Sequence, residues 1–217
     1  MGRRPYLETY LAMREFTDAR DEHTADEIWL VEHEPVFTQG LAGKPEHVLS
    51  ADGIPVLQTN RGGQVTYHGP GQVVAYALID LRRLGIYVKE YVYRLEHCVI
   101  KLLQDHGVSG HRVPGAPGLY VRLADPFGHA ALAAPPAGGD RFRGLGKIAA
   151  LGVKVSQHRS YHGLALNVDM DLSPFDRINP CGYPGLAAID LAKIGVSRDW
   201  ATVAGQLGKC LAAHLSP

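Results

Sequence analysis

Three cysteines are the residues of this chain best suited to covalent chemistry, and their settings differ. Cys98 and Cys210 fall among apolar residues at helical spacing, which predicts buried and unreactive thiols. Cys181 follows a proline in the turn Arg-Ile-Asn-Pro-Cys-Gly-Tyr, outside any periodic segment. Reactive groups concentrate on loops that a rigid scaffold holds, so Cys181 is the candidate nucleophile. The alternative is an exposed turn cysteine without a function.

A nucleophilic thiol needs a base or a cation beside it, because a free cysteine with a pKa of about 8.5 is mostly protonated at neutral pH. Lys147 is one candidate: it begins an apolar strand after Gly-Leu-Gly, where the alternative is a solvated strand cap. Its ammonium group would favour the thiolate. His158 and His162, four residues apart and expected on one face of a strand, are the other candidates, with surface or core histidines as the alternative.

The elements that must position these groups follow from hydrophobic periodicity. Helices are predicted over 6–20, over 88–104, and from Ser197 as N-cap to His214, and strands over 27–33, 73–81, 118–122, 147–155 and 163–168. The Ala-, Pro- and Gly-rich stretch 124–143 is predicted to be an exposed loop. This order predicts the α+β class, with helices packed on one mostly antiparallel or mixed sheet, and a single domain over 1–217.

A glycine-rich run, Arg61-Gly-Gly-Gln-Val-Thr-Tyr-His-Gly-Pro-Gly, precedes the predicted strand 73–81. It places four glycines and one proline around a short alternating segment. The backbone there is expected to approach another group closely. The spacing is not that of a dinucleotide-binding loop, and Gly146-Lys147 lacks the remaining residues of a phosphate-binding loop.

The composition excludes several classes of function. The 217 residues are 46% hydrophobic, and 22 basic residues balance 22 acidic ones, so no nucleic-acid partner is expected. No stretch reaches the roughly 18 unbroken apolar residues of a membrane span, and no apolar leader segment is found, so a cytoplasmic location is expected. Without clustered Cys/His spacing, neither a metal nor another cofactor is expected.

Four motifs stand in order along the chain, at residues 61–72, 146–155, 161–168 and 177–182, with Lys147 and Cys181 34 residues apart. With these motifs the chain resembles the lipoyl(octanoyl) transferases, most clearly from Glu32 to Leu186. The resemblance implies the fold of biotin and lipoate protein ligase catalytic domains. It also implies transfer of an octanoyl group from octanoyl-acyl carrier protein to a lysine of lipoyl domains, in 2-oxoacid dehydrogenase E2 subunits and glycine cleavage H protein, without nucleotide or metal.

The resemblance assigns roles residue by residue. Cys181 becomes the nucleophile that holds the octanoyl thioester, and Lys147 its proton-shuttling partner. The implied substrate-binding residues are Arg61, Gly62, Gly63, Gln64, Val65, Thr66, Tyr67 and His68, then Ala150, Leu151 and Gly152 at an expected strand break, and Gly163, Leu164 and Ala165 on the next strand. Small residues among these leave room for an apolar chain. His68 could instead cap the turn that follows it.

Two other functions remain open on the sequence alone. An ATP-dependent lipoate or biotin ligase of the same fold would have little need of a thiol, and a noncatalytic lipoyl-domain or acyl-carrier binding module would need neither Cys181 nor Lys147. The segment between Tyr120 and Lys147 is also longer than the resemblance implies. That insert is expected to be a spectator loop, with contact to a protein partner as the alternative.

Overall fold

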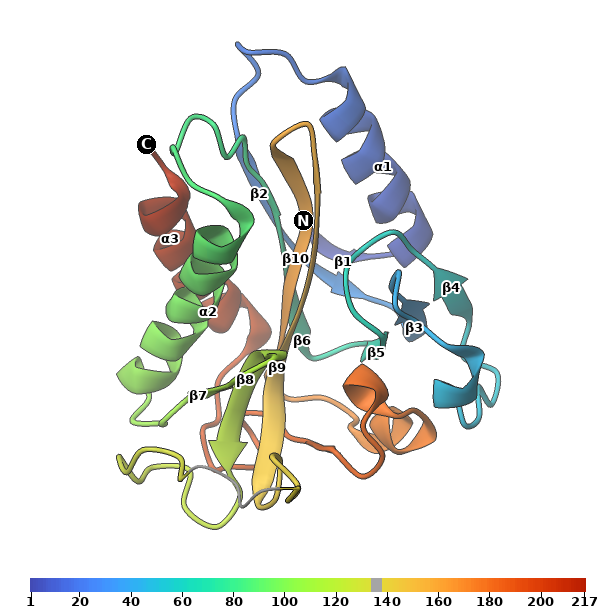
Figure 1. The fold of residues 1–217 in the computed structure, drawn as a ribbon, viewed down its shortest axis with the longest axis vertical. Helices are drawn as coiled ribbons and strands as arrows, with labels where there is room; N and C mark the ends of the chain where they lie inside the picture. The colour runs from blue at the N-terminus through green and yellow to red at the C-terminus, as the bar shows by residue number, and fades with distance from the viewer. Residues whose placement is uncertain (134–137) are drawn as a thin grey trace.

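The computed structural model describes residues 1–133 and 138–217, and it confirms the predicted α+β class (Figure 1). The helices and strands in chain order are β1 (Gly2–Arg4), α1 (Tyr6–Ala19), β2 (Glu27–His33), β3 (Val36–Gln39), β4 (Val56–Gln58), β5 (Val65–His68), β6 (Gln72–Leu78), α2 (Val88–Asp105), β7 (His111–Val113), β8 (Ala116–Arg122), β9 (Leu145–Ser156), β10 (Arg159–Asn167), β11 (Ala187–Ala188) and α3 (Trp200–Leu215). Short 3-10 turns occur at Pro45–His47, Ser173–Arg177 and Pro180–Gly182.

The large sheet has the strand order β1-β2-β6-β10-β9-β8-β7, with β11 paired to β9. Its pairs are antiparallel except β1 with β2 and β11 with β9. A small sheet has the order β4-β3-β5. Figure 1 shows α2 and α3 packed side by side on one face of the large sheet and α1 on the other. The predicted mixed sheet with packed helices is therefore confirmed.

The main hydrophobic core lies under α2 and α3. There the fully buried Tyr91, Leu95 and Leu207 meet the small β6 residues Ala75 and Ala77. A second cluster lies under α1, where Met13 packs on the opposite face of the sheet. Within the part of the chain that the structure describes, no helix is both long and apolar enough to span a bilayer.

A β-bulge in β9 determines which way Lys147 points. Ala149 pairs with Leu119 and Lys147 with Tyr120, which leaves Ile148 without a partner in β8. Ile148 and Ala149 both pack into the core under α2 and α3. Because the bulge interrupts the alternation of side chains, Lys147 comes to the opposite face of the sheet.

The strand break expected at 150–152 is wrong. β9 runs without interruption from Leu145 to Ser156, and its irregularity lies at the bulged residue Ile148. The small residues Ala150 and Gly152 are accommodated inside the strand, where they pair with Ala165 and Gly163 of β10.

Three other local predictions need correction. The N-cap of α3 is Asp199, not Ser197, because the Asp199 carboxylate accepts hydrogen bonds from the Thr202 amide at 2.9 Å and from its hydroxyl at 2.6 Å. His158 lies in the turn between β9 and β10 and so does not share a strand face with His162. The predicted strands did not include 36–39, where β3 lies, because all four residues of β3 are buried and show no alternation.

The predicted loop 124–143 contains no helix or strand in its described parts, 124–133 and 138–143. Its residues 134–137 lie outside the described residues.

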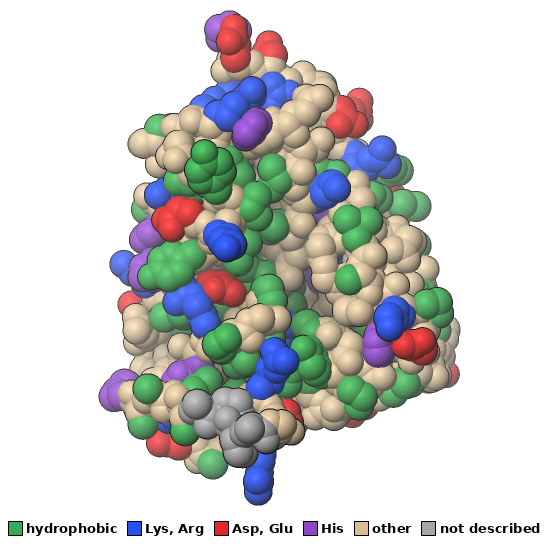
Figure 2. Space-filling view, viewed as in Figure 1, with side chains coloured by type: hydrophobic (Ala, Val, Ile, Leu, Met, Phe, Trp, Pro, Cys, Tyr) green, Lys and Arg blue, Asp and Glu red, His purple; other side chains and the backbone are tan. Residues whose placement is uncertain are grey.

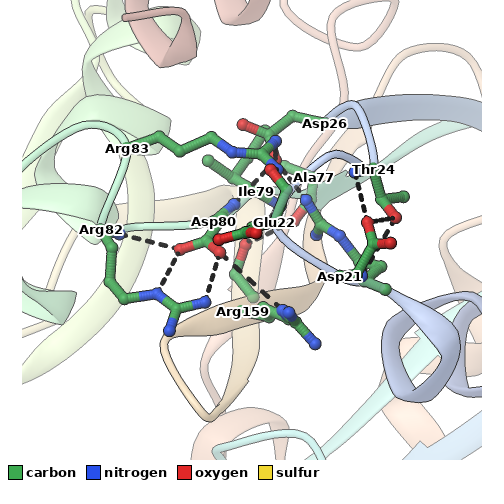
Figure 3. A network of polar contacts seen from close by, with 12 residues as sticks. Asp21, Glu22, Thr24, Asp26, Ala77, Ile79, Asp80, Arg82, Arg83 and Arg159 are labelled. Carbon is green, nitrogen blue, oxygen red and sulfur yellow. Dashed lines mark hydrogen bonds and ion pairs between the residues drawn. The ribbon is translucent and has the colours of Figure 1, made fainter.

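A network of ion pairs ties the end of β6 to two other segments (Figure 3). The Asp80 carboxylate forms an ion pair with the Arg82 guanidinium at 2.8 Å. It also lies 3.8 Å from the guanidinium of Arg159, at the start of β10. Asp26, just before β2, accepts from the Asp80 amide at 2.9 Å and pairs with Arg83 at 3.3 Å. The hydrogen bonds from the Arg82 side chain hold the pKa of Asp80 at about 2. The network fixes the end of the sheet from which β10 starts.

Candidate active site

The structure brings Cys181 and Lys147 into direct contact. The ammonium Nζ of Lys147 lies 2.8 Å from the Sγ of Cys181. Lys147 is only 6% exposed, while Cys181 is half-buried. No carboxylate pairs with Lys147 among the described residues, so the sulfur is its one candidate for an anionic partner. A lysine at this distance can give a proton to the sulfur or take one from it.

Cys181 sits in a tight turn that holds its backbone in an unusual conformation. Its φ of 58° and ψ of 17° are left-handed, a region that non-glycine residues occupy at a cost of about 1–3 kcal/mol. The turn is held by hydrogen bonds from the Gly182 amide to Asn179 and from the Tyr183 amide to Pro180. Pro180 fixes the entry and Gly182, at φ +77°, accommodates the exit.

Lys147 reaches the sulfur by crossing Gly118 of β8. Its Nζ also donates to the carbonyl of Pro117 at 3.2 Å, and it lies 5.5 Å from the centre of the Tyr120 ring. A Cβ on Gly118 would come within 2.7 Å of the Lys147 Cε and 3.1 Å of its Nζ. Glycine at this position is therefore what leaves the path open, and it was not predicted from the sequence.

A cavity extends from this pair across the face of β9, β10 and β6 that lies under α1. The registers place Ala150, Ala165 and Val74 in one row across the three strands, and Gly152 with Gly163 and Tyr76 in the next. The residues lining the cavity include Lys147, Cys181 and twelve of the fourteen residues implied as substrate-binding, namely Arg61, Gly63, Gln64, Val65, Thr66, His68, Ala150, Leu151, Gly152, Gly163, Leu164 and Ala165.

The other two implied residues, Gly62 and Tyr67, do not line the cavity. The Gly62 amide donates to the Val153 carbonyl at 2.9 Å, which attaches the glycine-rich loop to β9. Tyr67 packs between Phe37 and Phe175 in the small core beside β3 and β5. Tyr67 supports the loop from behind, because side chains in β5 alternate between the cavity and this core.

Arg61 is a buried cation that organises the glycine-rich loop. Its guanidinium is 7% exposed and donates to the carbonyls of Thr38 at 2.6 Å, Gln64 at 2.8 Å and Gly62 at 2.9 Å. Burial lowers its pKa, although arginine stays charged at any physiological pH. The glycine-rich loop folds around this charge, so the close approach expected from its glycines is that of backbone carbonyls to the Arg61 guanidinium.

His68 lies in the cavity wall and does not cap the turn that follows it. Its Nδ1 is 2.7 Å from the Gln72 side-chain oxygen, and the Gln72 amide donates to Asn167 at 2.9 Å. Burial, reinforced by the neighbouring His33, lowers the pKa of His68 to about 3. His68 is therefore a neutral hydrogen-bonding group in the cavity.

Several residues that line the cavity were missed in the sequence. Tyr6 of α1 stacks on His68 at 5.6 Å, and the Tyr76 hydroxyl lies 2.7 Å from Nε2 of His33. His162, named from the sequence as a candidate base, also lines the cavity, beside the motif residue Gly163, but it is Lys147 that contacts Cys181. The period-two pattern of β6 could have indicated Tyr76, because it shares a face with Val74. No sequence signal places Tyr6, since its position depends on how α1 packs.

Cys98 and Cys210 lie between α2 and α3, on the other face of the sheet from Lys147. Cys98 is fully buried, and burial raises the pKa of its thiol, as expected for a structural cysteine. Cys210 is half-buried. Their sulfur atoms and a ring nitrogen of His214 lie within 4.8 Å of one another, but Nδ1 of His214 already lies 2.9 Å from the Cys210 carbonyl. Neither thiol reaches the cavity.

Figure 2 shows the molecular surface in the same orientation as Figure 1. The visible face has a hollow near its middle, bordered by green hydrophobic side chains. Lysine and arginine side chains stand around the hollow at several points, with only scattered acidic ones.

Comparison with solved structures supports the fold. A bipartite lipoate protein ligase from Thermoplasma acidophilum superposes with a TM-score of 0.71 at 14% identity, over 99% of this chain and 81% of that one. A lipoate-protein ligase A bound with ATP gives a TM-score of 0.69 at 15% identity, over 98% and 83%. At these identities the likeness shows the shared fold and nothing finer.

Comparison with known sequences shows the family. The model of the lipoyl protein ligase A/B catalytic domain matches residues 5–204. An octanoyltransferase of Methylibium petroleiphilum is 66% identical over all of this chain and 97% of its own length, and one of Polaromonas naphthalenivorans is 63% identical with the same coverage. The resemblance read from the four motifs is confirmed. The chain thus belongs to the lipoyl protein ligase A/B catalytic domain family, and within it is an acyltransferase.

Proposed function

We propose that this acyltransferase moves an octanoyl group from octanoyl-acyl carrier protein to the lysine of a lipoyl domain, through a thioester on Cys181. The observation that carries the proposal is the 2.8 Å contact between Lys147 and Cys181 beside an apolar cavity. Relatives at 57–66% identity that are octanoyltransferases support the choice of acyl group.

In the first half-reaction the Cys181 thiolate attacks the carbonyl carbon of the octanoyl thioester. A new S–C bond forms, the bond to the carrier sulfur breaks, and the departing carrier thiolate takes a proton from the Lys147 ammonium. Lys147 is then neutral. Because one thioester replaces another, the step needs no ATP.

In the second half-reaction the amine of the acceptor lysine, already deprotonated by solvent, attacks the Cys181 thioester. The N–C bond forms, the C–S bond breaks, and the proton lost by the nitrogen goes to neutral Lys147. This restores the thiolate and ammonium pair. Formation of an amide from a thioester makes this half-reaction favourable.

The cavity suits an apolar chain of medium length. From β9 to β6 it crosses two inter-strand gaps, roughly 10 Å, which is comparable to an extended eight-carbon chain. Its floor is made of Ala150, Gly152, Gly163, Ala165 and Val74, with no charged side chain among them. Each methylene buried there contributes about 0.8 kcal/mol.

The remaining parts of the proposal concern partners and organisation. The acceptors are lipoyl domains of 2-oxoacid dehydrogenase E2 subunits and of glycine cleavage H protein, and the enzyme acts in the cytoplasm with no nucleic acid, membrane or cofactor involved. The whole chain forms one catalytic domain, and 124–143 is a spectator segment of it. The structural analysis of the Thermoplasma lipoate protein ligase describes that ligase and its E2 lipoyl domain as a lipoylation system, which supports a lipoyl-domain acceptor here.

Intact-protein mass spectrometry after incubation with octanoyl-acyl carrier protein tests the proposal. We expect one octanoyl adduct on Cys181 that hydroxylamine removes, and transfer of that octanoyl group to an added lipoyl domain. Cys98→Ala and Cys210→Ala serve as matched controls, since their thiols lie outside the cavity. An adduct that survives in Cys181→Ser, or none in the wild type, would contradict the mechanism.

The same variant separates the two remaining alternatives. An ATP-dependent ligase would keep its activity in Cys181→Ser and require ATP with a free acid. A noncatalytic binding module would show no turnover. Its affinity for the acyl carrier protein or the lipoyl domain would stay the same when both Cys181 and Lys147 are replaced.

A further inference from the structure

The two helices on the face of the large sheet away from Lys147 bring two cysteines and a histidine together. Cys98 comes from α2, and Cys210 and His214 come from α3. One ligand atom of each residue lies within 4.8 Å of the other two. Among the described residues this is the one group of three or more histidine, cysteine or carboxylate side chains close enough to share a metal ion.

The distances in this cluster suit a tetrahedral metal site. Zinc binds cysteine sulfur at about 2.3 Å and imidazole nitrogen at about 2.0–2.1 Å, which places two tetrahedral ligand atoms about 3.6–3.8 Å apart. The Sγ of Cys210 lies 3.7 Å from the Nδ1 of His214. Since no two of the three ligand atoms are more than 4.8 Å apart, side-chain shifts of about 1 Å bring all three to binding distance.

Regular helix geometry positions two of the three ligands. Cys210 and His214 are four residues apart in α3, so their side chains lie on one face of that helix, one turn apart. α3 packs against α2, where Cys98 is fully buried. Cys210 and His214 also belong to the last turns of α3, and the carbonyl end of a helix carries a partial negative charge that favours a cation.

The contact of His214 with its own helix does not prevent metal binding. Its Nδ1 lies 2.9 Å from the Cys210 carbonyl, which is also the acceptor for the helical hydrogen bond from the His214 amide. When the ring proton moves to Nε2, the lone pair of Nδ1 becomes free and the carbonyl keeps its helical partner. The exchange costs one neutral hydrogen bond, which is little compared with the bonds of a metal to two thiolates.

The ligand set favours a thiophilic divalent ion. Burial and the neighbouring Cys210 raise the pKa of the Cys98 thiol, so this thiol stays protonated without a metal. Binding replaces two S–H bonds by two metal–sulfur bonds, and the two protons pass to the solvent. The two thiolates then balance the charge of the ion, so the nearby Lys101 of α2 does not oppose binding.

We propose that Cys98, Cys210 and His214 form a zinc site that joins α2 to α3, with water as the fourth ligand. Cys210 and His214 are half-buried, so solvent reaches this side of the cluster. The site lies outside the cavity and takes no part in acyl transfer, but it stabilises the helical layer on the sheet. No metal was expected from the sequence, because the two cysteines are far apart along the chain.

Cobalt(II) in place of zinc gives the test an optical signal. The reduced Cys181→Ser protein is used, because it retains only the two cysteines of the helices. We expect one equivalent of Co²⁺ to produce a sulfur-to-metal charge-transfer band and the intense visible bands of a tetrahedral site. Added Zn²⁺ should remove both. Absence of the charge-transfer band would overturn the proposal.

Two variants in the same background test the ligands, and a third is their control. Cys210→Ser and His214→Gln each keep a polar side chain at a half-buried position. We expect each to weaken Zn²⁺ binding by more than about tenfold, since loss of even an outer partner of a metal ligand costs that much. His106→Gln should bind as before, because His106 also contacts α3, 3.1 Å from the Gln206 side-chain oxygen, but lies outside the cluster. Equal affinities in all three variants would contradict the ligand assignment.

Thermal unfolding and calorimetry provide a second measurement. Zn²⁺ should raise the Tm of the Cys181→Ser protein in a concentration-dependent way and leave that of the Cys210→Ser variant unchanged. Titrations in buffers of different ionisation enthalpy should count about two protons released for each Zn²⁺ bound. A Tm that Zn²⁺ does not change in the Cys181→Ser protein would overturn the proposal. If a ligand variant does not fold, the Co²⁺ spectrum of the Cys181→Ser protein still decides.

Discussion

At the scale of the residue, the candidate active site is a contact between the thiol of Cys181 and the ammonium of Lys147. This contact depends on neighbouring residues that have no reactive side chain. Lys147 reaches Cys181 only because Gly118 leaves its path free, and Cys181 faces Lys147 only because its turn holds a left-handed backbone. Both members of this pair could be named as candidates from the sequence, and the family resemblance implied that they act together. Gly118 could not, because it lies 29 residues before Lys147 and contacts it only through the pairing of β8 with β9.

Lys147→Met tests the role of the ammonium group, since methionine keeps an unbranched side chain without the charge. We expect the rate of octanoyl adduct formation on Cys181 to fall by about 10²- to 10⁴-fold, the usual range for removing a general acid or base. Alkylation of Cys181 by iodoacetamide at neutral pH should slow as well. If both rates stay within a factor of three of the wild type, Lys147 has no chemical role.

Gly118→Ala tests the path of the lysine side chain. The new methyl group, at a φ of +127°, would lie 2.6 Å from the Ala149 carbonyl oxygen and 2.7 Å from the Lys147 Cε, so both the backbone of β9 at Ala149 and the Lys147 side chain must move. We expect a loss of adduct formation approaching that of Lys147→Met. Gly85→Ala is the matched control, because Gly85 also has a positive φ but open space around it. Equal activity of both variants would contradict the inference.

At the scale of the element, the strands could be predicted from apolar runs, whereas their irregularities could not. The bulge at Ile148 and the left-handed His162 both interrupt the regular strand geometry, the one next to Lys147 and the other next to Gly163, which both line the cavity. A bulge depends on the pairing with a neighbouring strand, which a single run of sequence does not contain. Tyr6 escaped prediction for a similar reason, because the packing of α1 on the sheet brings it to His68.

Gly163→Ala tests how closely β10 packs on β6. A Cβ there would lie 1.9 Å from the Ala75 carbonyl oxygen, so the two strands must separate. We expect the free energy of unfolding in urea to fall by about 1–3 kcal/mol or more. Gly205→Ala in α3 is the control: a Cβ meets nothing within 4 Å there, and we expect a gain of about 0.5–1 kcal/mol. A stable Gly163→Ala variant would argue against the register.

At the scale of the whole molecule, the cavity is enclosed by the large sheet beneath and by α1 and the glycine-rich loop above. Closing it buries His68 and His162 as neutral rings, each with its pKa lowered to about 3. Sequence composition revealed eleven histidines but not which of them are buried, because burial depends on the arrangement of all these layers. The fold class could be predicted, but the layer that closes the cavity could not.

These two histidines make the protein sensitive to acid. Their folded-state pKa values lie below the unfolded value of about 6.5, so the unfolded chain binds more protons between pH 6.5 and pH 3. Their contribution to stability is complete above pH 6.5 and is lost as the pH falls toward 3, by up to about 1.4 kcal/mol per pH unit for each ring. Asp80, with its pKa at about 2, adds a further loss below about pH 4.

Urea unfolding between pH 7.5 and pH 4.5 measures this dependence. In His162→Phe we expect the slope of the unfolding free energy against pH to fall by about one proton. Asp80→Asn is a useful contrast, because it should change the slope only below about pH 4. An identical slope in the wild type and in His162→Phe would show that His162 is charged in the folded protein.

Because of the bulge at Ile148, the face of the sheet to which Lys147 points depends on the number of residues between Lys147 and Ala150. Beyond the bulge the odd-numbered Ala149 and Leu151 pack on the core under α2 and α3, and the even-numbered Ala150 and Gly152 lie on the opposite face of β9, whereas before the bulge the odd-numbered Lys147 lies on that opposite face. A single residue inserted between Lys147 and Ala150, without a second bulge, would reverse this parity and direct the ammonium into the core under α2 and α3. For the proposed mechanism, the length of this short segment therefore matters as much as the identity of the lysine.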